Sequence, residues 1–124
     1  EEMNLRECYE AMGADFDAVL FRLRSEGLIK KFVLKFVDDP SYSQLEQTMQ
    51  AEDYKEAFRA AHTIKGVAQN MGFDGLSQSS SDLTEWLRPA GEDKAVDIAE
   101  SDFFWTQVQA AFARTISAIK AMNE

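Results

Sequence analysis

The sequence predicts an all-α fold, an antiparallel up-and-down four-helix bundle with additional short N-terminal helices. Apolar residues recur at spacings of three and four along most of the chain, which is the period of a helix face. Strict alternation of apolar and polar residues, the period of a strand, is nearly absent. The chain has only two prolines, Pro40 and Pro89, and both stand at expected helix boundaries. Several helices with short connections favour a bundle.

Four helices are predicted in the first half of the chain, within residues 4–12, 15–24, 25–39 and 41–50. Gly13 ends the first helix, while Asp15 and Ser41 stand where the second and fourth begin, as capping residues do. Each helix has one apolar face, formed in chain order by Leu5, Cys8, Tyr9, Met12, Phe16, Val19, Leu20, Leu23, Leu28 or Ile29, Phe32, Val33, Phe36, Val37, Tyr42, Leu45 and Met49.

Three helices are predicted in the second half. The first begins at the N-cap Asp53, and its inward residues, spaced four, three, four and three apart, are Ala57, Ala61, Ile64, Ala68 and Met71. The second is expected to end at Pro89, and its inward residues are Phe73, Leu76, Ser79 or Ser80, Leu83 and Leu87. Residues 90–97 read as a loop. The last helix starts at about Ser101, and its aromatic residues Phe103, Phe104 and Trp105 are core candidates.

Composition predicts a single domain over residues 1–124 and argues against several classes of partner. The 13 basic and 22 acidic residues give a net charge of −9, which argues against nucleic acid or an anionic membrane as the main partner. One cysteine, Cys8, allows no internal disulfide and fits a reducing compartment. No apolar run approaches the ~20 residues of a membrane span, and no signal-peptide pattern is visible. We therefore expect a monomeric protein in the cytoplasm.

The stretch AAHTIKGVAQNMGF, residues 60–73, contains the only histidine in the chain, His62. His62 follows the inward Ala61, and one residue turns a helix by about 100°, so the imidazole points away from the core. Residues three and four positions away share its surface. They are Phe58, Arg59, Lys65 and Gly66, with Gln69 one turn further on.

Each of these residue types has a chemical use beside a histidine. Imidazole is largely neutral near pH 7 and can then act as a nucleophile. The ammonium group of Lys65 can stabilise an anionic phosphoryl group on the ring. Gly66 costs the helix about 1 kcal/mol relative to alanine, and its benefit would be clearance for a phosphate or a partner's backbone. Gly72 lies where a helix end tolerates positive φ.

Simpler interpretations exist for each residue taken alone. A lone histidine is usually a surface residue with no task, and a glycine within a helix is often a close packing contact. Gly72 is most simply a C-cap, and Cys8 is best explained as a small buried hydrophobe. One histidine, one cysteine and the absence of a Glu-x-x-His pair predict no metal site. The combination of residues around His62 is harder to explain without a function.

The combination resembles the signature of histidine-containing phosphotransfer (HPt) domains, a His-x-x-Lys-Gly core with a further glycine six residues after the first. His62, Lys65, Gly66 and Gly72 match it position by position. Phe36 sits in the place of the phenylalanine-rich helix upstream, and an amphipathic helix follows the motif. The resemblance covers roughly residues 15–90.

The resemblance implies a phosphocarrier without ATP-dependent kinase activity of its own. His62 would accept a phosphoryl group from a receiver-domain aspartate or a sensor histidine kinase and pass it to another receiver aspartate. Lys65 would stabilise the phosphoryl charge and Gly66 would allow steric access. No cofactor is implied, because Mg²⁺ comes with the receiver of the response regulator. The surface that meets the partner would be bordered by Phe58, Gln69, Thr84 and Arg88.

One departure from the family pattern affects the subclass. Chemotaxis-kinase versions have a glutamate that hydrogen-bonds the histidine, and the matching position here holds Thr84, with Glu85 just beyond it. Two alternatives stay open: a helical scaffold whose histidine is never phosphorylated, and the N-terminal phosphoacceptor domain of a chemotaxis-type kinase.

Overall fold

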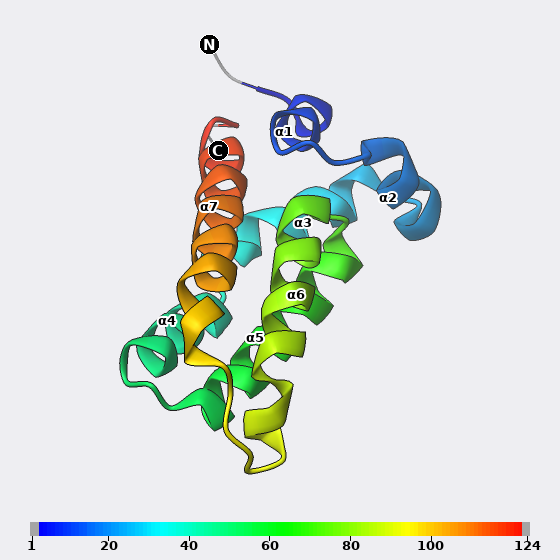
Figure 1. The fold of residues 1–124 in the computed structure, drawn as a ribbon. Helices are drawn as coiled ribbons and strands as arrows, with labels where there is room; N and C mark the ends of the chain where they lie inside the picture. The colour runs from blue at the N-terminus through cyan, green and yellow to red at the C-terminus, as the bar shows by residue number, and fades with distance from the viewer. Residues whose placement is uncertain (1–2, 123–124) are drawn as a thin grey trace.

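The computed structural model describes residues 3–122, and within that range the chain is helical and has no β-strand (Figure 1). The predicted all-α class is therefore confirmed. The elements in chain order are α1 (Leu5–Ala11), α2 (Phe16–Leu23), α3 (Glu26–Phe36), α4 (Ser41–Gln50), α5 (Tyr54–Met71), α6 (Asp74–Gly91), the short 3-10 helix η1 (Ile98–Glu100) and α7 (Ser101–Lys120).

Helices α4 to α7 form the bundle. The hairpin of α5 and α6 is its centre, α4 packs on α5, and α7 packs on α6. Tyr42 of α4 stacks on Phe112 of α7 with ring centroids 3.6 Å apart, which joins the two outer helices. The short helices α1, α2 and α3 lie at one end of the bundle, where α1 contacts α7 (Figure 1). At that end the Met3 amide donates to the Ala121 carbonyl over 3.0 Å.

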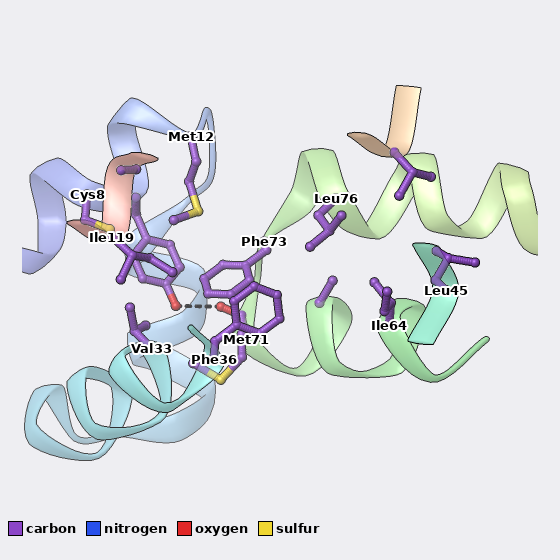
Figure 2. Packing of buried hydrophobic residues seen from close by; sticks show 14 of the residues in the cluster. Cys8, Met12, Val33, Phe36, Leu45, Ile64, Met71, Phe73, Leu76 and Ile119 are labelled. Carbon is purple, nitrogen blue, oxygen red and sulfur yellow. Dashed lines mark hydrogen bonds between the residues drawn. The ribbon is translucent and has the colours of Figure 1, made fainter. Parts of the chain in front are cut away.

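One hydrophobic core runs through the N-terminal helices and the bundle. The rings of Phe36 on α3 and Phe73 before α6 meet edge to face, with centroids 5.2 Å apart. Tyr9 of α1 contacts the same Phe73 ring at 5.7 Å. Figure 2 shows Phe36 and Phe73 between the residues around Cys8 and those around Ile64. The N-terminal helices are therefore packed into the domain core.

The N-terminal helices also complete the C-terminal end of α5, where the last carbonyl groups of a helix lack partners within the helix. The buried Tyr9 hydroxyl donates to the Met71 carbonyl over 2.6 Å, and the Arg22 guanidinium of α2 donates to the Asn70 carbonyl. Gly72 follows in the left-handed conformation, with φ +72°. The helix that carries His62 is thus held at its end by α1 and α2.

Burial of Cys8 makes a prediction about its reactivity. Its side chain is fully buried, and this burial raises the pKa of the thiol to about 11. Because the thiolate is the reactive form, we expect a thiol reagent to label Cys8 very slowly in the native protein at pH 8 and rapidly in denaturant. The measurement is the rate of disulfide exchange with a chromogenic reagent with and without urea. Equal rates in both states would show that Cys8 is accessible in the folded chain.

The predicted N-cap residues are confirmed in two cases and wrong in one. The side chains of Asp15 and Asp53 accept backbone hydrogen bonds from the first turns of α2 and α5, as predicted. Ser41, in contrast, is the first residue within α4, and the N-cap is Pro40. The Ser41 amide donates instead to the side chain of Asp39 over 2.8 Å. The predicted serine cap is replaced by an aspartate two residues upstream.

The inward face of α3 is narrower than predicted. Ile29 is buried and Leu28 is exposed, which settles the alternative left open by the sequence. Phe32 and Val37 were expected to point inward, but they are 37% and 39% exposed. The reason is that α3 is covered along one face only, which Ile29, Val33 and Phe36 fill. The α3 surface next to this face is left with large apolar side chains in contact with solvent.

Two further predictions in the second half were wrong. Pro89 does not end α6, which continues to Gly91. A proline in the last turn removes only one helical hydrogen bond, so the helix can continue past it. The two residues that follow lie close to Phe58, since a Cβ on Gly91 would lie 2.7 Å from that ring. Phe103 is not a core residue, since it is 62% exposed at the start of α7.

Candidate functional site

Helix α5 presents His62 on its outer side. The predicted inward residues of this helix are all buried: Ala57, Ala61, Ile64, Ala68 and Met71. The alanines let neighbouring helices approach closely, and they fix the rotation of α5 about its axis. His62 lies on the opposite side of the helix and is exposed. Its ring centroid is 6.4 Å from that of Phe58, one turn before it.

The other motif residues lie on the same outer face. Lys65 is half-buried, while Gly66 and Gln69 are exposed. A Cβ placed on Gly66 would meet no atom within 4 Å, so the fold itself leaves that position open. Gly66 therefore provides a stretch of bare backbone one turn from the imidazole. The structure brings together the residues that the sequence analysis selected on α5.

The open space at Gly66 predicts opposite effects on stability and phosphotransfer. Gly66→Ala should raise the free energy of unfolding by up to about 1 kcal/mol, because alanine favours the helix and meets no clash. The same methyl group should slow phosphotransfer to His62 about tenfold, because it projects beside the approach path. Urea unfolding and a transfer time course measure the two effects.

Gly75→Ala is the matched control, because a Cβ there also meets nothing within 4 Å. Gly75 lies on α6, outside the His62 face, so this substitution should leave transfer unchanged. Unchanged transfer in Gly66→Ala would mean that the first motif glycine has no role in access.

Helix α6 completes the site from the side of Phe58. The guanidinium of Arg88 lies over the Phe58 ring, 5.4 Å from its centroid. Arg88 also donates two hydrogen bonds to the Glu85 carboxylate, over 3.0 Å from Nε and 2.6 Å from Nη2. Gly91 lies against the same Phe58 ring, where no Cβ would fit. Phe58 is therefore held between α5 and α6, beside the imidazole.

These side chains border an open hollow of about 430 Å³, which is lined by Phe58, Arg59, His62, Thr63 and Arg88. The hydrogen bond from Arg88 lowers the pKa of the Glu85 carboxyl below its ordinary value, and the charges of Arg88, Lys65 and His62 add to the effect. Glu85 therefore interacts with the charges on both helices. An anionic group of phosphate size could approach His62 through this hollow.

Thr84 does not belong to the surface around His62, contrary to the prediction that it borders the docking face. It is fully buried, and its hydroxyl donates to the Ser80 carbonyl of its own helix over 2.6 Å. The reason is the rotation of α6, which turns Thr84 inward together with Leu83 and Leu87. Glu85, the next residue, is exposed and carries the carboxylate of this region.

Glu85 and Gly91 shape the site but were not selected by sequence reasoning. Glu85 stands three residues before Arg88, a spacing at which opposite charges pair on a helix, so this signal was available. Gly91 gave no local signal, because its role depends on the Phe58 ring that reaches it from α5.

Nothing in the described part of the chain suggests a metal centre or a membrane span. Within residues 3–122 no group of three or more histidine, cysteine, aspartate or glutamate side chains could hold a metal ion. Over the same residues, no helix combines the length and apolar character that crossing a bilayer requires.

The fold and the site define a helical bundle domain that presents its single histidine on an outer helix face, with a lysine and an open glycine beside it. The model of the Hpt domain family matches residues 40–121, and the chain belongs to this family. No curated protein and no solved structure matches the chain. The matched region contains α4 to α7, so α1 to α3 lie outside it although they share its core.

Membership fixes the general role of the domain. Hpt domains are histidine phosphotransfer modules of two-component phosphorelays, and they carry phosphoryl groups rather than transfer them from ATP. Their partners are receiver domains or histidine kinases.

Proposed function

We propose that His62 is the phosphoacceptor, and that it receives a phosphoryl group from a receiver aspartate or a kinase and passes it to another receiver aspartate. One observation carries the proposal: in an Hpt family chain, the only histidine is exposed beside a glycine that the fold leaves open. We also propose that the protein works as a monomer in the cytoplasm.

The transfer step uses one nitrogen of the His62 ring as the nucleophile. Its lone pair attacks phosphorus while the P–O bond to the receiver aspartate breaks. The electron pair of that bond returns to the carboxylate, and the other ring nitrogen keeps its proton. Lys65, on the same face one turn away, stabilises the charge on the phosphoryl oxygens. The reverse step passes the group to the next receiver.

We propose that this chain supplies no cofactor to the reaction. The Mg²⁺ that neutralises charge during phosphoryl transfer would arrive with the partner receiver, since carboxylates of such a site hold that ion. The residues described around His62 contribute the acceptor ring and cationic side chains instead.

The partner surface extends from His62 in two directions. Toward α6 it meets Phe58 and Arg88, and along α5 it meets Gln69. Between α3 and α5, one turn past Gly66, lies a groove of about 260 Å³ whose apolar lining includes the exposed Phe32. Exposed apolar residues next to a reactive group are typical of a contact surface. We propose that the receiver that reaches His62 also covers this groove.

Phe32→Ser tests the contact with the groove. Because Phe32 is partly exposed, the substitution should leave the fold intact but raise the receiver concentration needed for half-maximal transfer about fivefold or more. Phe103→Ser is the matched control, an exposed phenylalanine on α7 that does not line the groove. Equal effects of the two substitutions would remove α3 from the docking surface.

The test of the proposed function is incubation with each phosphorylated receiver of the same organism. We expect at least one receiver to transfer phosphate to the chain in a form that is labile in acid and stable in base, and peptide mapping to place it on residue 62. The absence of such phosphate with every receiver and with a small phosphoryl donor, phosphoramidate, would favour the scaffold alternative. Measured binding of a receiver without transfer would support the same alternative.

A further inference from the structure

Two arginines share the hollow beside His62, and each is paired with a glutamate of its own helix. On α5, Arg59 forms an ion pair with Glu56, three residues before it. On α6, Arg88 forms the two hydrogen bonds with Glu85 described above, again at a spacing of three. Both arginines line the hollow that His62 borders. The same arrangement of cation and carboxylate is thus built from both helices that flank the ring.

The fold does not need these ion pairs. The side chains of both pairs are between 46% and 63% exposed, and exposed ion pairs contribute little to stability. Arg88 also keeps its place through the Phe58 ring, so it stays by the hollow if Glu85 is removed. Neither carboxylate is therefore required by the fold, and each can act on the hollow through the arginine that it pairs with.

Charge balance shows what that effect would be. With neutral His62, the hollow and its neighbours include three cations, Arg59, Lys65 and Arg88, and the two carboxylates paired with the arginines, Glu56 and Glu85. The Glu92 and Asp93 carboxylates also interact electrostatically with Arg88 and Arg59. A phosphoryl group on the ring adds nearly two negative charges. Without the glutamates the three cations would stabilise that group strongly, and a carrier must release it again. Phosphohistidine stability is therefore sensitive to both carboxylates.

We propose that Glu56 and Glu85 are positioning residues that set the equilibrium of phosphoryl transfer, since they occupy Arg59 and Arg88 and limit the stabilisation of phospho-His62. This inference rests on the proposed function. The equilibrium concerned is phospho-aspartate plus His62 against aspartate plus phospho-His62, in which one P–O bond is exchanged for one P–N bond. The influence of the Lys65 and His62 charges on the pKa of Glu85 supports the coupling.

The experiment is a measurement of that equilibrium constant with a receiver that transfers to the wild-type chain. Glu85→Gln and Glu56→Gln should each shift it toward phospho-His62 by about two- to fivefold, because each removes a negative charge near the phosphoryl group. Arg88→Gln should shift it toward the receiver. The double variant Glu85→Gln/Arg88→Gln should return close to the wild-type value, because both charges of the pair are gone.

Asp17→Asn is the matched control for loss of a paired carboxylate. Asp17 of α2 pairs with Arg6 of α1 over 2.9 Å, outside the hollow, and its loss should leave the constant unchanged. A merely structural role for the pair predicts that Glu85→Gln and Arg88→Gln move the constant in the same direction without recovery in the double variant. That result, or unchanged constants in both glutamate variants, would overturn the inference alone. A wild-type chain that takes no phosphate from any donor would overturn the proposed function as well.

Discussion

His62→Gln is expected to abolish phosphorylation while the fold keeps its stability. His62 is the only histidine of the chain, so no other imidazole can replace it as acceptor. The ring is exposed, and its nearest aromatic neighbour, Phe58, is already held by Arg88 and Gly91. Substitutions at such surface positions usually change the free energy of unfolding by less than about 0.5 kcal/mol. Function and fold are therefore separable at this residue.

The two effects need separate measurements on the same preparation. Acid-labile phosphate after incubation with phosphorylated receivers should fall below detection in His62→Gln, and the urea midpoint should match that of the wild type. Binding to the receiver should survive, because the docking surface around residue 62 is otherwise intact. Phosphate transfer that persists in this variant would contradict the proposed acceptor. A large loss of stability would show that the ring supports the fold.

The part of the site on α5 could be predicted because one helix sets it. Residues three and four apart share a helix surface, so the sequence alone placed Phe58, Lys65 and Gly66 around His62. The rotation of α6 could be predicted as well, because its expected inward residues Leu76, Leu83 and Leu87 are buried. Thr84 was wrong because the family resemblance, not the helix period, assigned it to the docking surface, and packing of α6 against its neighbours buries it.

The misplaced residues of the fold have the same origin. Phe32 and Val37 fit a helical apolar face, but α3 packs along a narrower face than its sequence offers. Pro89 carries a strong local signal for a helix end, yet α6 continues for two more residues, Ala90 and Gly91. Gly91 lies against the Phe58 ring of α5, and the local sequence does not reveal this tertiary contact. The spacing of apolar residues and the capping residues determine where helices form. Packing against neighbouring helices determines how much of each apolar face is buried.

The role of Gly72 differs from that of Gly66, although both belong to the motif. Gly72 adopts φ +72°, and a Cβ there would lie 2.1 Å from Cγ2 of Val19 on α2. Gly72→Ala should therefore lower the free energy of unfolding by about 2–5 kcal/mol, through the left-handed backbone and the clash together. Urea unfolding followed by tryptophan fluorescence measures it.

Gly13→Ala separates the two causes, because Gly13 has nearly the same φ, +73°, and its Cβ would meet only the flexible end of Arg114, 3.2 Å away. It should cost about 1–2 kcal/mol, the backbone contribution alone. Val19→Ala combined with Gly72→Ala should be less destabilising than the sum of the single changes, because the clash is then absent. Equal losses of unfolding free energy in Gly13→Ala and Gly72→Ala would mean that α2 can shift away from residue 72 without a free-energy cost. A larger loss in Gly72→Ala would instead show that the close contact with α2 fixes the end of the helix that carries His62. The second motif glycine would then be required for the fold, and the first for access of the partner.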